Sequence, residues 1–284
     1  MRLPRPKRDD VRVVPASRRG KAVGAGGLAG IVVGILALLG VFAGGGFDYS
    51  NPFDQFPQAP PGSAREVPGA PDAEDETVEF LRFVTGDIND FWEQRFSQAG
   101  STYRPAIVNV FSGSVRTGCG TATSAVGPFY CPADEQVYLD LGFFRELANR
   151  FRAPGDFAQA YVVAHEIGHH VQNITGITDQ VARGSAADPG AANELSIRTE
   201  LQADCLAGVW GHSTYERGLL ETGDLEEGLA AAAAVGDDRI QVEATGRIRP
   251  ETWTHGSSQQ RTDWFLRGFE TGDPARCDTF TEDI

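Results

Sequence analysis

The sequence predicts an α+β fold that is mostly helical, carries a small antiparallel sheet and is preceded by one transmembrane helix. A stretch without charge near the N-terminus indicates the membrane helix. Several long segments repeat apolar residues at spacings of three and four, and only short apolar runs flanked by glycine and proline lie between them. The chain has 284 residues, 41% hydrophobic and 23% charged, values typical of a globular protein that exclude disorder over the whole chain.

Charge is distributed unevenly along the chain. Residues 1–21 carry eight Lys or Arg and two Asp, a net charge of +6, whereas the remainder carries 17 basic and 37 acidic side chains, a net charge of −20. A body this acidic repels phosphate groups, so nucleic acid is excluded as a partner. We interpret residues 1–21 as a basic cytoplasmic tail.

Residues 22–47 contain no charged residue and predict a transmembrane segment. As a helix, Val23–Ala43 spans ~30 Å, about the thickness of the hydrocarbon core of a bilayer. Three basic residues directly precede the segment and the next one is Arg65, so the positive-inside rule places the N-terminus in the cytoplasm and the later residues outside. A cleaved signal peptide is the competing interpretation, but its apolar region is usually ~7–15 residues long.

The remaining chain divides into a linker and one domain. Residues 48–72 are rich in Pro and Gly and predict a linker, and residues 73–284 form the domain. Its first helix is expected over Asp75–Gln98, followed by a strand over Ala106–Phe111 and a hairpin or short sheet over Thr117–Leu139. Further helices are expected over Leu141–Phe151, from Asp156 as N-cap to Gln172, from Asn193 as N-cap to Trp210, over Leu225–Val235 and over Ser258–Gly268.

Four cysteines, all beyond the charge-free stretch, indicate an oxidising compartment and two disulfides. Three pairings are possible. We favour Cys119–Cys131, which closes a short loop, and Cys205–Cys277, which ties the last segment to the domain. A zinc cluster is the alternative, but no C-x-x-C spacing supports it.

The segment that carries chemistry is His165-Glu166-Ile167-Gly168-His169, on a predicted helix. Histidines four residues apart project from one helix face and can bind a single Zn²⁺. Glu166 lies beside the first ligand, where it can take a proton from water activated by the metal. A helix with two surface histidines is the competing interpretation. Apolar flanks argue against it, as does Gly168, which costs roughly 0.8–1 kcal/mol relative to Ala unless another backbone approaches it.

A later predicted helix supplies the third ligand. Glu200 lies 31 residues beyond His169, and Asp204 follows one turn later on the same face. A solvated acidic face is the competing interpretation, but apolar flanks predict that this helix packs, and a buried carboxylate needs a cation or a hydrogen-bond donor. Glu200 would complete a His₂Glu site with the fourth position open, as in catalytic zinc sites. Asp204 would accept the free N–H of a liganding histidine, with His165 favoured. One Zn²⁺ per chain is therefore expected.

These segments resemble the bacterial family of neutral zinc metallopeptidases, single-span membrane proteins with a zincin-type domain. The resemblance rests on HEIGHHVQ and ELQADCLAGVW, on GPFYCPADEQVYLD and GDFAQAYVVA before them, on Thr254–Asp273, and on CDTF at 277–280. It covers roughly residues 73–280. It implies a zincin-like fold with zinc ligands at His165 and His169, a glutamate base at Glu166 and a gluzincin-like third ligand at Glu200.

Other polar residues have less specific roles. His255 lies in a polar loop and is a candidate for stabilising the oxyanion of a tetrahedral intermediate, with a helix-capping loop residue as the alternative. Arg261 is a second candidate for that role, unless it pairs with an acid. His170 and His212 are interpreted as packing or surface residues. Gly120–Tyr130 is either an edge strand that pairs with an extended peptide or a structural hairpin.

The sequence thus predicts a membrane-anchored zinc endopeptidase that hydrolyses peptide bonds outside the cytoplasm, on peptide or protein substrates of the cell envelope. One alternative is a non-catalytic, zinc-containing envelope-binding protein. Glu166 argues against it, because a structural zinc site needs no base. The other alternative is a zinc amidase acting on envelope material, which the same residues would serve equally well.

Overall fold

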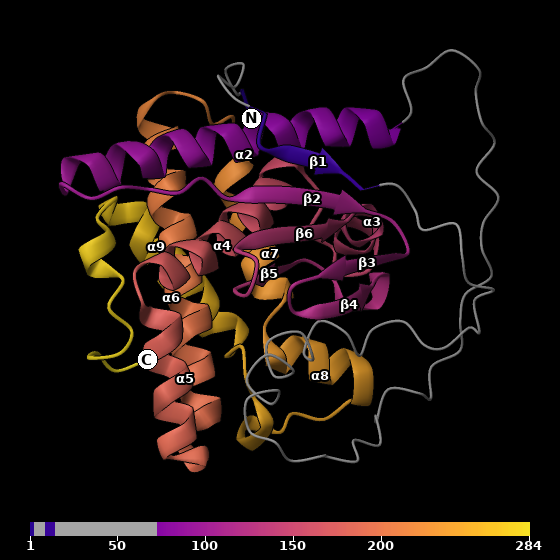
Figure 1. Cartoon of the computed structure of the whole chain (residues 1–284). Coiled ribbons are helices and arrows are strands. Elements are labelled where there is room, and N and C mark those ends of the chain that lie inside the picture. Colours follow the sequence, from indigo (N-terminus) through magenta and orange to yellow (C-terminus); the bar gives the residue numbers. More distant parts are fainter. Residues whose placement is uncertain (3–8, 15–72) are drawn as a thin grey trace.

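The structure, a computed structural model, describes residues 1–2, 9–14 and 73–284 (Figure 1). The expected transmembrane segment, 22–47, and the linker, 48–72, lie outside the described residues. Among the helices of the described ranges, none is long and apolar enough to cross a membrane.

A four-stranded mixed sheet forms one side of the domain (Figure 1). Its strands lie in the order β1 (Val11–Val13), β2 (Ile107–Phe111), β6 (Gln136–Asp140) and β5 (Phe129–Cys131). β1, β2 and β6 run parallel, and β5 runs antiparallel to β6. A separate antiparallel hairpin consists of β3 (Ser114–Thr117) and β4 (Gly120–Thr123). The prediction of an antiparallel sheet is therefore wrong for the main sheet. The chain passes through the hairpin and β5 before it returns as β6, a connection long enough for parallel pairing with β2.

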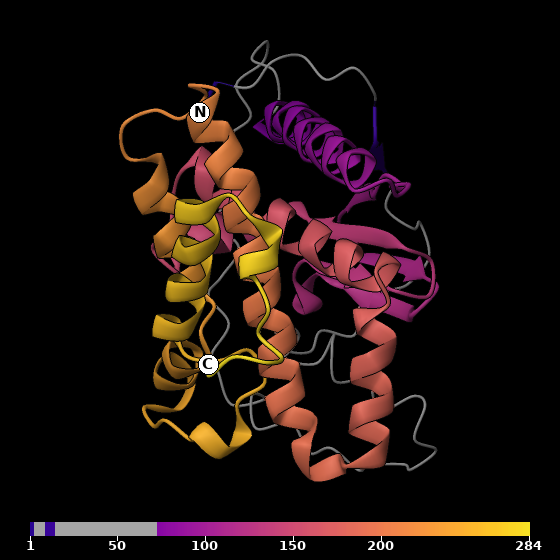
Figure 2. The same ribbon diagram turned by 90° about the vertical axis from the view of Figure 1, so that its left-hand side faces the viewer.

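Helices make up most of the domain, as expected. They are α2 (Ala73–Gln98), α3 (Leu141–Asn149), α4 (Asp156–Ile174), α5 (Ile177–Ala187), α6 (Ala192–Glu216), α7 (Asp224–Ala234), α8 (Asp237–Thr245) and α9 (Ser258–Thr271). Figure 2 shows the late helices, orange to yellow, on one side of the molecule and the magenta sheet on the other. α4 contacts β5 and β6 as well as α6 and α7, so it forms the centre of the fold.

Two helix starts differ from the prediction. Asp156 is the first residue of α4 rather than its cap, which is Gly155, and α6 begins at Ala192, so Asn193 lies inside its first turn. The Asn193 amide donates to the Glu251 carbonyl instead of capping the helix. The apolar spacing of the sequence does not predict α5 and α8, because both are short and each buries only one residue.

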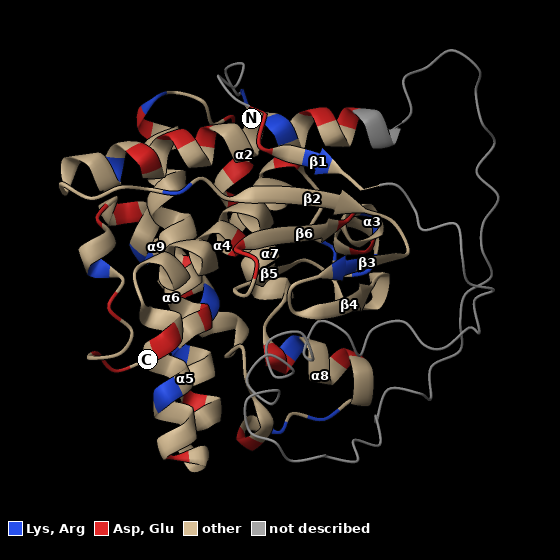
Figure 3. Cartoon of the chain, in the orientation of Figure 1, with Lys and Arg blue, Asp and Glu red and all other residues tan. Residues whose placement is uncertain are grey.

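The sheet buries both of its faces. Val108 and Val110 of β2 belong to the large core that includes α4, whereas Phe129 and Tyr138 stack at 5.1 Å in a smaller cluster with residues of the hairpin. Successive strand residues point to opposite faces, which explains this division. Charged residues lie mainly on helices and loops, and β2 carries none (Figure 3). The buried valines of β2 therefore belong to the same core as α4.

α9 packs on α6 at backbone contact. A Cβ at Gly208 would lie 2.0 Å from the Phe265 carbonyl oxygen, and a Cβ at Gly268 would lie 1.9 Å from that of Cys205. Only glycine allows this approach. The contact brings Arg261, in the first turn of α9, next to α6.

Both cysteine pairs favoured from the sequence are bonded. Cys119 joins Cys131, which links the hairpin to β5, with 5.9 Å between their Cα atoms. Cys205 joins Cys277, with 5.5 Å between their Cα atoms, and ties the C-terminal segment to α6. Among the described residues no cysteine is free.

Residues 1–2 and 9–14 pack against the domain. The Met1 ammonium donates to Asp156 at 2.8 Å and to Glu221 at 3.1 Å. Burial alone would lower the pKa of this ammonium, but these carboxylates raise it to about 10. The described residues of the expected basic cytoplasmic tail, 1–2 and 9–14, thus contact the domain.

The position of β1 bears on the predicted topology. β1 pairs with β2 from Val11 opposite Val108 to Val13 opposite Val110. A single membrane crossing between these strands would place them on opposite sides of the bilayer. A molecule in which β1 pairs with β2 therefore cannot also have residues 22–47 inserted as a single membrane span.

Candidate metal centre

Three buried side chains from two helices converge on one point. His165 and His169 lie one turn apart on α4, and their Nε2 atoms are 3.1 Å apart. Glu200 of α6, 1% exposed, places Oε2 3.2 Å from the Nε2 atom of His165 and Oε1 3.5 Å from that of His169. The structure thus brings together the three residues that the sequence predicts as metal ligands.

The donor set fits a zinc ion. Ligand atoms ~2.0–2.1 Å from a tetrahedral zinc are separated from one another by ~3.3 Å, close to the three distances between these atoms. Glu200 Oε1 is buried and has no hydrogen-bond partner among the described residues, which is costly for a carboxylate unless a cation accompanies it. His165, His169 and Glu200 would therefore hold the metal.

The site depends on a close approach of α4 to α6. A Cβ at Gly168 would lie 3.1 Å from the Ala203 carbonyl oxygen and 3.2 Å from the Ala203 Cα. The expected reason for a glycine inside the motif, approach of another backbone, is confirmed. Without a side chain at Gly168, Glu200 reaches the two histidines.

A buried polar network holds His165. Its Nδ1 lies 2.9 Å from Asp204 Oδ1, and Tyr161 also donates to this oxygen. Arg261 donates to Asp204 through Nε at 2.8 Å and through Nη2 at 2.9 Å. Burial alone would raise the pKa of Asp204, but Arg261 and His165 outweigh burial and lower it. The carboxylate therefore accepts the Nδ1 proton of His165, which leaves Nε2 free to bind a metal.

Glu166 and His255 line the same pocket as the three ligands. Burial raises the pKa of Glu166, while the neighbouring histidines oppose the shift. Most of the other lining residues are apolar, among them Phe129 and Tyr130 of β5, Phe143 of α3, Val162 of α4 and Val181 of α5. Ser196 and Thr199 of α6 and Arg261 of α9 add polar groups to the lining.

Asp237, which the sequence does not predict as a site residue, positions His255. Its Oδ2 accepts the backbone N–H groups of Thr254, His255 and Gly256 at 2.7, 2.7 and 3.1 Å, and its Oδ1 lies 3.2 Å from His255 Nδ1. Burial alone would lower the pKa of His255, but the bond to Asp237 raises it. No local motif marks Asp237, because it lies 18 residues before the histidine.

The two other histidines have structural partners, as interpreted from the sequence. His170 lies 3.1 Å from the Tyr130 hydroxyl and 2.6 Å from the Arg104 carbonyl oxygen. His212 lies 2.6 Å from the Phe269 carbonyl oxygen. Neither lines the pocket.

Comparison with known proteins agrees with this geometry. Residues 7–280 match the family described as "Putative neutral zinc metallopeptidase". The uncharacterized protein YpfJ of Escherichia coli (strain K12) is 51% identical over 212 residues, 74% of each chain. The uncharacterized protein Rv2575 of Mycobacterium tuberculosis is 51% identical over 185 residues, 61% of this chain and 62% of that protein. No solved structure matches the chain. Because the match covers nearly the whole chain, the protein belongs to this zinc metallopeptidase family.

Proposed function

We propose that the protein is a zinc endopeptidase. The observation that carries this proposal is the buried cluster of His165, His169 and Glu200, whose ligand atoms lie 3.1–3.5 Å apart in a pocket that also contains Glu166. A purely structural zinc site has four protein ligands and needs no base beside them. Three ligands, a neighbouring carboxylate and an adjoining pocket favour catalysis.

Glu166 acts as the general base and then as the general acid. A zinc ion held by His165, His169 and Glu200 would lower the pKa of a water molecule and polarise the scissile carbonyl. Glu166 accepts one proton as the water oxygen bonds to the carbonyl carbon. It returns that proton to the amide nitrogen as the C–N bond breaks, and a carboxylic acid and an amine result.

His255 stabilises the oxyanion. Asp237 accepts from Nδ1 and raises the pKa of His255, which favours the protonated ring, and the Nε2–H of that ring donates to the negative oxygen that develops in the pocket. Arg261, the second candidate, binds Asp204 and acts through the network around His165.

The pocket walls support a substrate with an apolar side chain next to the scissile bond, because Phe129, Phe143 and Val162 line it. β5 is an edge strand of the main sheet, and its Tyr130 also lines the pocket. An extended peptide would pair with this edge. Of the stretch Gly120–Tyr130, the residues in β5 would thus pair with the peptide substrate. The residues in β4 belong to the structural hairpin.

The domain works outside the cytoplasm, on peptides or proteins of the cell envelope. Two disulfides support this location, since such bonds persist in oxidising compartments. Residues 22–47 anchor the chain in the membrane as a single span with the N-terminus in the cytoplasm. In that anchored form β1 stays on the cytoplasmic side and β2 becomes the edge of the sheet.

The test uses the full-length protein with zinc, its Glu166→Gln variant and isolated cell envelopes. We expect mass spectrometry to find peptides released only by the wild type, with new termini next to apolar residues. Release of amide-linked cell-wall fragments without protein cleavage would overturn the endopeptidase in favour of the amidase. No released material from a zinc-loaded wild type would favour the non-catalytic binding protein.

A further inference from the structure

The second metal histidine is oriented by a glutamine on its own helix. His169 Nδ1 lies 2.8 Å from Gln172 Oε1. The Gln172 amide can adopt only one orientation, because its Nε2 faces the Thr199 carbonyl oxygen at 2.7 Å, and a carbonyl only accepts. Oε1 therefore faces His169, Nδ1 carries the proton, and Nε2 of His169 presents its lone pair to the metal.

A second glutamine continues this chain of hydrogen bonds. Gln172 Nε2 also donates to Gln202 Oε1 at 3.0 Å, and Gln202 Nε2 donates to the Cys277 carbonyl oxygen at 2.9 Å. The Cys277 carbonyl oxygen determines the orientation of the Gln202 amide. The NH₂ groups of both glutamines therefore point away from His169. Both glutamines are buried, at 1% and 7% exposure, where water does not compete for these bonds.

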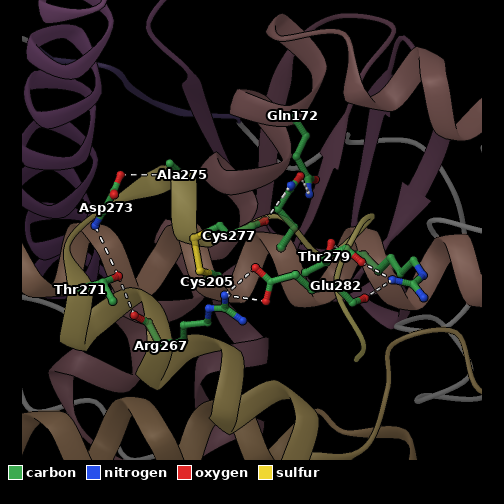
Figure 4. The surroundings of a disulfide bond; sticks show 11 residues. Gln172, Cys205, Arg267, Thr271, Asp273, Ala275, Cys277, Thr279 and Glu282 are labelled. Atoms are coloured by element: carbon green, nitrogen blue, oxygen red, sulfur yellow. Dashed lines mark hydrogen bonds and ion pairs between the residues drawn. A yellow bond between two sulfur atoms is a disulfide. The ribbon is translucent and has the colours of Figure 1, made fainter.

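The Cys277 carbonyl group is the last acceptor in this series of hydrogen bonds, and a disulfide holds its residue in place. Cys277 is bonded to Cys205 of α6, and Thr279 donates through Oγ1 to the Arg198 carbonyl oxygen at 2.6 Å. Arg198 in turn donates to the carbonyl oxygens of Thr279 and Glu282. Figure 4 shows the Gln172 side chain directed toward the segment that carries Cys277, with the disulfide beside it.

We propose that Gln172 and Gln202 are positioning residues that aim His169 at the metal, and that the Cys205–Cys277 disulfide anchors them through the Cys277 carbonyl. The inference rests on the proposed zinc site. The C-terminal segment would then help to orient His169, as Asp204 helps to orient His165.

Zinc affinity of the full-length protein tests the inference. Chelator competition should show zinc binding weakened roughly 10–100-fold in Gln172→Leu, as is typical when such a partner of a metal ligand is lost. Gln202→Leu should weaken binding less, because Gln172 keeps its bond to the Thr199 carbonyl. With Co²⁺ in place of zinc, the visible absorption bands of both variants should shift, because they report ligand geometry.

The two disulfides provide a matched pair of variants. Replacing Cys205 and Cys277 together by Ser should weaken zinc binding, whereas replacing Cys119 and Cys131 should leave it unchanged. The thermal unfolding of each metal-free variant, measured alongside, separates metal binding from folding. Wild-type zinc affinity and cobalt spectra in a folded Gln172→Leu protein would overturn the inference and leave the zinc site standing. A wild-type protein that binds no zinc would instead overturn the proposed function.

Discussion

Gly168 of α4 lies so close to Ala203 of α6 that a Cβ at Gly168 would be 3.1 Å from the Ala203 carbonyl oxygen, tighter than ordinary van der Waals contact. This contact sets the distance between the helix that carries the two histidines and the helix that carries the glutamate. It is therefore the point at which a small change in packing would alter the metal site.

Gly168→Val should weaken zinc binding at least tenfold and destabilise the fold by ~1–3 kcal/mol, because the added atoms meet backbone that cannot rotate away. Gly184→Ala in α5 is the control, because its Cβ meets only the flexible end of Leu195. Calorimetry and chelator competition would measure both effects. Equal zinc affinity in the two variants would contradict the role of the contact.

Alanine at His165, His169 or Glu200 should reduce bound zinc well below one ion per chain, measured by elemental analysis after dialysis, because each supplies one of three protein ligands. Glu166→Gln should retain the ion and lose hydrolysis, since a base is not a ligand. Full zinc retention in Glu200→Ala would show that the third ligand has been assigned wrongly.

His255→Ala should lower kcat roughly 10²–10³-fold while zinc stoichiometry stays at the wild-type value, because the lost group contacts the developing oxyanion rather than the metal. Steady-state kinetics on a cleaved envelope peptide would measure the loss. An unchanged kcat would return His255 to the alternative role of a structural loop residue.

Asp237 should make the free energy of unfolding depend on pH. Burial opposes ionisation, but His255 and the backbone N–H groups outweigh it and lower the pKa of Asp237 below 3.8. A lowered folded-state pKa means that this stabilisation is present above the unfolded-state pKa and is lost as pH falls through the folded-state value. Urea unfolding between pH 5 and 3 should therefore show a smaller loss of stability in Asp237→Asn than in wild type. Equal slopes would contradict the shift.

The membrane prediction concerns the whole chain. Protease added to intact spheroplasts should remove the domain and leave a small membrane-bound stub, with an N-terminal epitope tag protected inside. A mature protein that begins at Gly44–Phe47 would instead identify a signal peptide. If the tag and the domain are equally accessible, or equally protected, the β1–β2 pairing persists in the cell and the single span is wrong.

Short-range geometry made part of the metal centre predictable from the sequence. His165 and His169 share a helix face because four residues make about one turn, and Asp204 follows Glu200 for the same reason. Glu200 itself was identified by a physical requirement, since a carboxylate on a packed helix needs a cation or a donor. Apolar spacing likewise predicted α2, α4 and α9 to within a few residues.

Only the tertiary structure decided which distant residues meet. Asp237 reaches His255, and Gln202 reaches Cys277, through loops and helix packing that leave no periodic signal in the sequence. The sequence also could not predict that β2 and β6 pair in parallel. The alternation of residues in a strand shows which face is buried but not the direction of the neighbouring strand. Local geometry thus determined the ligand spacing, while long-range packing decided how the ligands are held.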